Sequence, residues 1–494
     1  MFFLSLQPSK NEPCKIMKAY RVLIFIILVL TALAAICLFF PKKGVKIGNA
    51  ELHFPSIEDV LVGDTTVKDI QDVVPEMDSV ELAHLNSLRD TLEQYEEAIT
   101  EGVGHFYFPN NDATFFDPLF SKLSSAKAHG EVVRILHYGD SQIEMDRISC
   151  DIRRFFQRTF GGGGPGLVPV IQSIPSFAVS QNASGDLVLH TSYGEGARAK
   201  GNYGLMCKCY QLTGAATFNA VASRHKDTDG RVKKFSTVTL LYNDRNGNLS
   251  ATLSDRNSPY RDTATSTQTG VHTFRWQMDS ATSSLRIAMR GNADLYGIFL
   301  DNGPGVAVDN IPLRASSGDQ FTLITDTLLR ACYREANVGM IILQFGGNAI
   351  PVIYNDKSLN NYLTRIEQQI RCVKRACPKA TLLFIGPSDM SKSQGGAMRT
   401  YPMLPRLIDS LRTIALRNHA AYWDIYEVMG GQNSMVSWVR NGLAGPDYVH
   451  FTPAGARKVG RMLADNFATI YEYYRTRKSI PQEQYETLWN ESGH

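Results

Sequence analysis

The stretch VVRILHYGDS, residues 132–141, decides the fold that the sequence predicts. It opens with an apolar run and ends in a turn at Gly139. Such a run is typical of a parallel strand that is buried on both faces. From Met145 to Phe156, the apolar residues recur at the spacing of one helical face. The predicted order is therefore strand, tight turn and helix, and Ser141 lies on the turn.

Similar units recur in the last third of the chain. They are expected as a strand at 340–343, a helix at 359–376, a strand at 381–385, a helix at 404–419, a strand at 420–426 and a helix at 452–474. Alternating strands and helices predict an open parallel sheet that is covered by helices on both faces. Ligands of such sheets bind at the carboxyl ends of the strands.

The pattern changes between residues 172 and 300, where helical periodicity is lost. Short runs of alternating polar and apolar residues replace it, and turn pairs such as Asp229-Gly230 and Asn246-Gly247 separate them. This texture is typical of an antiparallel β-sandwich. Because α/β units lie on both sides of it, the sandwich is expected as an insertion in the α/β domain.

An apolar segment lies near the N-terminus. Residues 22–40 are 19 positions without a charge or a proline, just long enough to span the hydrocarbon core of a membrane. Lysines and arginines flank the segment on both sides, so the flanking charge fixes its orientation only weakly. The large C-terminal side favours a signal anchor with the body of the chain outside the cytoplasm. A cleaved signal peptide that starts at Met17 is the alternative.

These observations divide the chain into segments. They are a cytoplasmic N-terminus (1–21), a transmembrane signal anchor (22–40), a tether and helical stalk (41–104), the first part of the α/β domain (105–171), the inserted β-sandwich (172–300), the second part of the α/β domain (301–475) and a polar tail (476–494). Helical spacing from residue 79 to residue 100 predicts a stalk or packing helix that is too short for a coiled coil.

The composition excludes several classes of protein. The formal net charge is +3, with 44% hydrophobic and 20% charged residues. These values exclude a disordered chain, a collagen and a polytopic membrane protein, and they give no reason to propose a nucleic-acid partner. The spacings of the 8 cysteines match no usual zinc motif, so we expect buried or free thiols, with one disulfide as the alternative. No metal or other cofactor is predicted.

Three polar stretches are expected where strand ends converge. Ser141 lies on a strand-to-helix turn, where its amide is at a helix N-terminus that favours a developing anion. Asn348 follows another buried strand and can direct its side-chain amide to the same point. His450 precedes the last helix and is placed to take the Ser141 proton, while Asp447 holds the imidazole tautomer. An ordinary turn and a helix cap are the alternative interpretations.

This pattern resembles the SGNH hydrolase superfamily, also called the GDSL-type esterases. The matching blocks are Gly139-Asp140-Ser141 for Gly-Asp-Ser, Gly346-Gly347-Asn348 for Gly-x-Asn-Asp, and Asp447 with His450 for Asp-x-x-His. The resemblance implies a flavodoxin-like three-layer α/β/α domain. It also implies that Ser141 is the nucleophile, His450 the base and Asp447 the residue that orients the base.

The resemblance implies an oxyanion hole as well. Its donors are the Ser141 amide, the Asn348 side chain and a glycine amide of the second block. Gly318 is the best candidate for that glycine, with Gly303 or Gly305 as alternatives. The supporting residues are Asp140, which braces the turn, Gly139 and Gly346. Two positions depart from the family pattern: Ala349 replaces an aspartate and Gln142 replaces a leucine.

The envelope-associated branch of this superfamily is the most similar. Bacterial peptidoglycan O-acetylesterases have a β-rich insert between the first two blocks that is similar to a carbohydrate-binding module. The stretches Gly161–Gly166 and Met429–Met435 also resemble signatures of Bacteroides-type relatives. For the glycine run, a flexible exit from the preceding helix is favoured over a substrate loop.

The sequence and the resemblance together lead us to expect a membrane-anchored serine esterase in the periplasm or at the cell exterior. It is expected to remove O-acetyl or other short acyl groups from cell-envelope glycans such as peptidoglycan. Its partners are then the acylated glycan and, through the N-terminal helix, the inner membrane, with the oligomeric state left open. The alternatives are an O-acetyltransferase that acts on an envelope polysaccharide and a non-catalytic glycan-binding protein.

Overall fold

The computed structural model describes residues 88–102, 104–194, 201–223, 228–255 and 258–480, with a few positions between 24 and 52. Contacts divide the chain into two units, Met1–Thr66 and Val67–His494. In the first unit, β1 (Val45–Ile47) pairs antiparallel with β2 (Ala50–Leu52). The predicted N-terminus, most of the 22–40 segment and most of the tether lie outside the described residues, as does the tail beyond residue 480. None of the described helices is long and apolar enough to cross a membrane.

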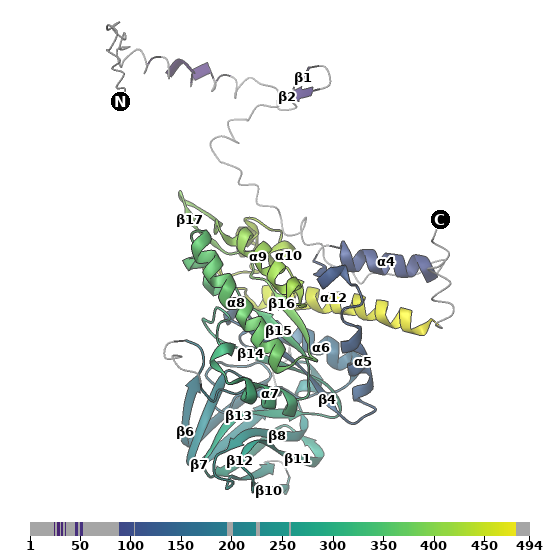
Figure 1. Cartoon of the computed structure of the whole chain (residues 1–494), viewed down its shortest axis with the longest axis vertical. Coiled ribbons are helices and arrows are strands. Elements are labelled where there is room, and N and C mark those ends of the chain that lie inside the picture. The colour runs from purple at the N-terminus through teal and green to yellow at the C-terminus, as the bar shows by residue number, and fades with distance from the viewer. Residues whose placement is uncertain are drawn as a thin grey trace, which may run out of the picture. The chain divides into compact units, whose positions relative to one another are not determined.

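The second unit is built around a six-stranded sheet (Figure 1). In spatial order its strands are β14 (Gly305–Pro312), β4 (Val132–Gly139), β15 (Val338–Gln344), β16 (Thr381–Ile385), β19 (Ala421–Trp423) and β3 (Phe106–Tyr107). All neighbours run parallel except β3, which pairs antiparallel with β19. Numbered along the chain, the five parallel strands have the order 2-1-3-4-5, which is the flavodoxin-like order.

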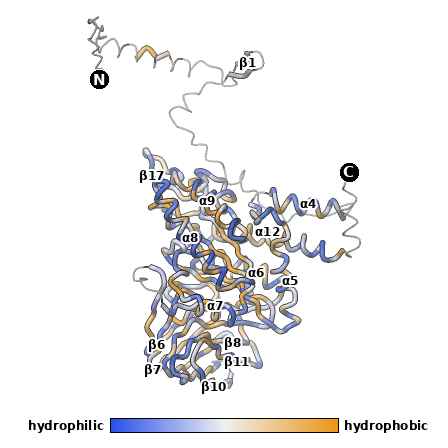
Figure 2. The backbone as a smooth tube through the Cα atoms, viewed as in Figure 1, coloured by the Kyte–Doolittle hydropathy of each residue, from blue (hydrophilic) through white to orange (hydrophobic). Residues whose placement is uncertain are grey.

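Helices cover both faces of this sheet and complete three layers (Figure 1). One face carries α5 (Asp117–Ala126), α6 (Ser149–Phe160) and α12 (Pro453–Ser479); the other carries α7 (Asp326–Glu335), α8 (Asp356–Ala376) and α9 (Leu404–Arg417). Successive residues of β4 show the division, because Ile135 packs in the core of the first layer and Leu136 in that of the second. Figure 2 shows hydrophobic and hydrophilic positions alternating along α8 and α12, as expected for helices with one buried face.

The insert is antiparallel throughout. Its strands are β5 (Gly166–Val168), β6 (Val179–Thr191), β7 (Lys208–Ala222), β8 (Phe235–Asp244), β9 (Ser250–Asp255), β10 (Arg261–Thr265), β11 (Gly270–Thr282), β12 (Ser284–Arg290) and β13 (Ala293–Asp301). Hydrogen bonds join all nine strands of the predicted β-sandwich into one continuous sheet. The reason is the length of β7, which pairs with β13 near Leu212 and with β12 from Ala215 onward.

The remaining elements correct some predicted boundaries. The strand expected at 420–426 is only β19, because the Asp424 side chain accepts a hydrogen bond from the Glu427 amide and starts α10 (Ile425–Met429). Two further elements lie outside the predicted set. They are a short helix, α11 (Ser434–Arg440), and an antiparallel hairpin of β17 (Ser391–Gln394) and β18 (Ala397–Thr400). The last helix continues four residues past the predicted end of the domain at 475, to Ser479.

The helix α4 (Leu88–Thr100) packs on the domain rather than standing apart as a stalk. Leu92 and Ile99 are buried, and the ring of Tyr95 lies 6.4 Å from that of Tyr473 in α12. The apolar periodicity that predicted this helix therefore serves packing against α12.

The glycine run Gly161–Gly166 is a packed connection, not a flexible one. Gly161 accepts a hydrogen bond from the Val306 amide, and Gly164 donates one to the Arg231 carbonyl. Gly162 has a φ of +88°, and a Cβ there would lie 2.5 Å from the Val306 carbonyl oxygen. Only glycine fits this close approach of two backbones, so the run seats the end of α6 on β14.

A buried ion network joins the insert to the central sheet. Arg134 on β4 is 4% exposed and bonds to Asp301 on β13 and to Asp309 on β14, with 3.1 Å from Nη1 to Asp309 Oδ1. Its guanidinium also lies 3.8 Å from the centroid of the Phe299 ring on β13. Asp309 accepts a further hydrogen bond from the Leu167 amide of β5, at 2.7 Å. Four strands of the junction, β4, β5, β13 and β14, are therefore joined through one pair of buried carboxylates.

We expect the Arg134→Met substitution to lower the free energy of unfolding by about 3–5 kcal/mol, because it leaves two buried carboxylates without a cationic partner. Denaturant unfolding followed by circular dichroism measures the change. The matched control is Arg330→Met on the exposed side of α7, which should change the free energy by no more than about 0.5 kcal/mol. Equal stability of the two variants would contradict the role of the network.

Candidate active site

The predicted nucleophile lies on a tight turn at the carboxyl end of β4. The strand ends at Gly139, and a short 3-10 helix, η2 (Ser141–Ile143), follows it directly. Asp140 caps this helix, since its Oδ1 accepts a hydrogen bond from the Gln142 amide at 2.9 Å. A Cβ on Gly139 would meet the Ile143 side chain at 3.0 Å, which keeps the turn tight. Ser141 thus lies where the strand order reverses between β4 and β15, the position at which such sheets bind ligands.

The structure brings Ser141, His450 and Asp447 together. The Ser141 hydroxyl lies 2.8 Å from His450 Nε2, although 309 residues separate them along the chain. His450 Nδ1 lies 2.8 Å from Asp447 Oδ2. Both side chains are close to half exposed, 43% for His450 and 51% for Asp447. The arrangement is that of a nucleophile, a base and a carboxylate that orients the base.

The electrostatics of Asp447 suit this role. Burial would raise the pKa of its carboxyl, but hydrogen bonds from the backbone and ring of His450 and from the Val449 amide outweigh burial and hold the pKa below its ordinary value. The amides of Val449 and His450 each lie 3.0 Å from Asp447 Oδ1. Asp447 is therefore ionised at neutral pH, which favours a proton on His450 Nδ1 and leaves Nε2 free to accept one from Ser141.

Asn348 lies beside this group at the end of β15, in the 3-10 helix η5 (Gly347–Val352). Its Nδ2 donates to Asp140 Oδ2 at 3.3 Å and to the Ser316 carbonyl at 3.1 Å. Asn348, Ser141 and His450 line one cavity of about 380 Å³. Gly346 precedes them with a φ of +127°, and a Cβ there would lie 3.1 Å from the Pro387 ring.

The predicted glycine of the oxyanion hole does not have a free amide. The Gly318 amide donates to the Ser316 hydroxyl at 3.0 Å, and Phe345 and Ile366 close around its Cα. The alternatives are wrong on topology: Gly305 pairs with Val132, at the amino end of β14, and Gly303 precedes it. Both glycines lie at the amino ends of the parallel strands, whereas Ser141 lies at their carboxyl ends.

Asp140 is a buried acid next to the nucleophile. It is 5% exposed, and burial raises the pKa of its carboxyl to about 6, although the hydrogen bond from the Gln142 amide and the charge of His450 act in the other direction. In its ionised form, Asp140 accepts hydrogen bonds from both Gln142 and Asn348. The charge state of Asp140 therefore controls how firmly Asn348 is held.

Gln142 holds the two halves of the site together, and this role was missed in the sequence. Its Nε2 donates to the Val449 carbonyl at 2.6 Å, and its Oε1 accepts from the Phe451 amide at 3.2 Å. These two backbone groups flank His450. In the sequence, Gln142 was visible only as a departure from the leucine of the family pattern, so nothing pointed to a contact 309 residues away.

Arg147, just before α6, also links the turn of Ser141 to the loop of His450. Its guanidinium donates to the carbonyls of Ser141, Glu144 and Phe451, at 2.6, 3.0 and 3.0 Å. The nucleophile turn and the loop that carries His450 are thereby tied together at a second point.

The stretch Met429–Met435 contacts the site indirectly, through Asp389 and the hairpin of β17 and β18. Buried Asp389 accepts from the Met435 amide and from the Thr400 hydroxyl, both at 2.8 Å. Asn433 and Thr400 exchange two further hydrogen bonds. The hairpin that ends at Thr400 begins at Ser391, whose amide donates to the Tyr448 carbonyl. The signature therefore anchors a hairpin that contacts the loop of Asp447 and His450.

The described residues contain neither a cluster of metal ligands nor a disulfide bond. No group of three or more His, Cys, Asp or Glu side chains there is arranged to hold a metal ion. The six cysteines within it, at positions 150, 207, 209, 332, 372 and 377, are unbridged.

The comparisons with known proteins bear on the fold. No family model and no curated protein matches the sequence. Among solved structures, the chain is similar to a peptidoglycan O-acetylesterase, with a TM-score of 0.59 and 23% identity over 73% of this chain and 96% of that chain. The chain shares the fold of this esterase. The fold that the sequence resemblance implied is thereby confirmed.

Other matches among solved structures are weaker. A family two carbohydrate esterase from Cellvibrio japonicus is 9% identical, with a TM-score of 0.24, over 60% of this chain and 99% of that one. A GDSL-like lipase from Bacteroides ovatus is also 9% identical, with a TM-score of 0.24, over 60% and 98%. At these TM-scores the two matches carry no argument about this chain.

We expect Gln142→Leu to lower kcat for ester hydrolysis by about 10- to 100-fold, with little change in KM, because His450 loses its fixed position while the substrate cavity is kept. Steady-state kinetics with a soluble acetyl ester measure the split between kcat and KM. Gln268→Leu, at an exposed position of the insert, is the control and should behave as the native protein. A Gln142→Leu variant with native kcat would show that the contact does not position His450.

In the plot of log kcat/KM against pH, we expect the loss of activity in acid to depend on the uptake of two protons. As pH falls through about 6, Asp140 becomes protonated and loosens Asn348, and His450 must also be neutral to act as a base. We therefore expect log kcat/KM to approach a slope of two in acid. For Asp140→Asn, which cannot ionise, the slope should be one and the activity at pH 8 lower. A native profile with a slope of one would rule out the participation of Asp140.

Proposed function

We propose that this protein is a serine esterase that removes O-acetyl groups from a glycan. The observation that carries the proposal is the unbroken line of hydrogen bonds from Ser141 through His450 to Asp447, at the carboxyl ends of the parallel strands. A serine, a histidine and an ionised carboxylate in this order are the machinery of acyl transfer.

The mechanism runs in two steps. Ser141 Oγ attacks the ester carbonyl while His450 Nε2 takes its proton, and His450 then gives that proton to the departing sugar hydroxyl. In the second step, His450 takes a proton from water as the water oxygen attacks the acyl-serine. The proton returns to Ser141 Oγ as acetic acid leaves, and the acid gives up its remaining proton to solvent to become acetate. Asp447 stabilises the imidazolium in both steps.

The oxyanion is held by the amide of Ser141 and by Asn348 Nδ2. Asn348 now donates to Asp140 and to the Ser316 carbonyl, so it exchanges one of these acceptors for the substrate oxygen. The Gly318 amide is already used by Ser316. We therefore assign Gly318 to shaping the wall beside Asn348 rather than to donating a hydrogen bond to the oxyanion.

Hydrolysis is favoured over transfer to a second sugar by the exposure of the base. His450 is 43% exposed and Asp447 is 51% exposed, so water reaches the acyl-serine directly. An enzyme that transfers the acyl group to a glycan has to exclude water from this position.

The substrate we propose is an O-acetylated cell-envelope glycan such as peptidoglycan. Support comes from the fold shared with a peptidoglycan O-acetylesterase and from the β-rich insert, whose Leu205 carbonyl accepts a hydrogen bond from Tyr138, three residues before Ser141. We further propose that residues 22–40 anchor the chain in the inner membrane, with the catalytic domain in the periplasm or at the cell exterior. This placement rests on the 19 uncharged residues of that segment.

We expect Ser141→Ala to lower acetate release from O-acetylated peptidoglycan by about 10⁴-fold or more, and Asn348→Ala by about 10²- to 10³-fold. Acetate is measured by a coupled assay, and circular dichroism checks that both variants are folded. A fluorophosphonate probe should label the native protein and leave Ser141→Ala unlabelled.

The proposal fails if the folded native protein takes up no probe and releases no acetate from any acetyl ester. The same assay with an added acceptor sugar separates hydrolysis from transfer. Acetylated acceptor appearing in place of acetate would identify a transferase.

A further inference from the structure

A second cavity, of about 540 Å³, lies between the insert and the central domain and has no part in the mechanism above. The insert contributes Met206 and Lys208 to its lining, and the central domain contributes Asp146, Arg153 and Asn310. Prolines and aliphatic side chains make up much of the remaining wall. The cavity therefore offers an apolar chamber with a few polar groups, which is the usual character of a binding site.

Lys208 is the unusual member of this lining. It is only 4% exposed, yet its ammonium has no hydrogen-bond acceptor and no carboxylate partner within the described part of the chain. The ammonium lies against an aromatic ring, with Nζ 5.9 Å from the centroid of the Tyr193 ring. Buried lysines are almost never left unpaired, because a desolvated ammonium without a partner is costly.

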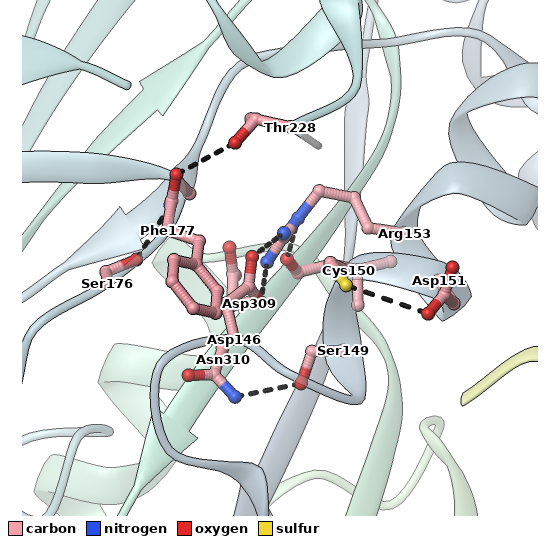
Figure 3. A network of polar contacts seen from close by, with 12 residues as sticks. Asp146, Ser149, Cys150, Asp151, Arg153, Ser176, Phe177, Thr228, Asp309 and Asn310 are labelled. Carbon is pink, nitrogen blue, oxygen red and sulfur yellow. Dashed lines mark hydrogen bonds and ion pairs between the residues drawn. The ribbon is translucent and has the colours of Figure 1, made fainter. Parts of the chain in front are cut away.

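The other charged groups of the wall are already satisfied. Arg153 donates to Asp146, with 3.0 Å from Nη2 to Oδ1, and to the Val308 carbonyl at 2.7 Å. Asn310 donates to the Ser149 hydroxyl at 2.8 Å. Figure 3 shows Arg153 directed at Asp146, and Asn310 at Ser149. Lys208 is thus left as a positive charge that the wall itself does not neutralise.

The cavity lies close to the nucleophile. Pro312 in its wall pairs with Gly139, two residues before Ser141. Asp146, also in the wall, is five residues after Ser141, so their Cα atoms are at most about 18 Å apart. The wall of the cavity therefore includes residues next to the strand end and the turn that carry Ser141.

We propose that this cavity is a subsite for a carboxylate carried by the acylated glycan, and that Lys208 forms an ion pair with it. The proposal rests on the proposed function of Ser141. A singly charged carboxylate matches the single ammonium that the wall does not neutralise, whereas a doubly charged phosphate would leave one negative charge uncompensated in a largely apolar chamber. The carboxylate comes either from an acidic sugar or from a peptide attached to the sugar.

The titration of Lys208 agrees with this assignment. Burial lowers the pKa of its ammonium to about 8, so that it remains mostly charged at neutral pH. The groups that face it are Tyr193 and Cys207 from the insert and Asp146 and Arg153 from the opposite wall. Since the folded pKa is lowered, the unliganded protein should gain stability as pH rises from about 8 toward the ordinary lysine value. A bound carboxylate should remove this dependence.

The decisive experiment compares Lys208→Met with the native protein on matched substrates. One pair is O-acetylated muropeptides with free or amidated peptide carboxylates; the other is O-acetylated galacturonate oligosaccharides with free or reduced carboxyl groups. We expect Lys208→Met to lower kcat/KM by about 10- to 100-fold for one substrate with free carboxylates. Its neutral counterpart should lose much less. The pair that responds identifies the source of the carboxylate.

Two further measurements complete the test. Calorimetric binding of the same compounds to Ser141→Ala, with and without Lys208→Met, detects the subsite without turnover, so failure of the esterase proposal stays distinguishable. Lys357→Met on the exposed side of α8 is the matched control and should change neither quantity. The melting temperature of Lys208→Met should equal or exceed that of the native protein. The proposal would be overturned if Lys208→Met left two quantities as they are in the native protein. They are the ratio of kcat/KM for free over neutralised carboxylates and the ratio of the corresponding affinities.

Discussion

The candidate site depends on one amide side chain that joins two distant parts of the chain. Gln142 follows the nucleophile directly, and its two polar atoms bond to the backbone on either side of His450. A loop that is exposed and far away in the sequence is thereby fixed against the rigid end of a buried strand. Without this contact, the distance between Ser141 and His450 would rest on the bond between them, on Arg147 and on the hairpin that contacts the loop of Asp447 and His450. An amide fits this task because it donates and accepts at once, which neither an aliphatic nor a charged side chain does.

The central sheet explains why these residues meet. In parallel strands with the order 2-1-3-4-5, the connections leave β4 and β15 in opposite directions, and a crevice opens between their carboxyl ends. Ser141 enters this crevice from β4 and Asn348 enters it from β15. Asp140 then links them, since its carboxylate accepts from the turn on one side and from Asn348 on the other. Burial of that carboxylate makes the link sensitive to pH.

The sequence predicted the features that depend on local pattern. The apolar run of β4, the amphipathic helices and the meeting of Ser141, Asn348, Asp447 and His450 follow from strand periodicity, from the parallel topology and from the family resemblance. The prediction failed where long-range contacts decide. Asp424 shortens β19 by capping a helix that periodicity alone does not reveal. Gly318 was chosen for its residue type, but the neighbouring Ser316 hydroxyl takes its amide. The roles of Gln142 and Lys208 could not be predicted from the neighbouring sequence. The role of Gln142 depends on contacts with residues that are distant in the chain, and that of Lys208 on its burial without a carboxylate partner among the described residues.

The junction built on Arg134 has a consequence for how the two parts of the domain can be exchanged. Its carboxylate partners sit on β13 and β14, one on each side of the boundary, and the glycine run seats the chain against β14 with no room for a side chain. Grafting a foreign lectin-like module between residues 171 and 301 would therefore remove Asp301, one of the two carboxylate partners of the buried Arg134. Substitutions in the linings of the two cavities can change the range of substrates without altering this network. Exchange of the whole insert is disfavoured, because it disrupts the network.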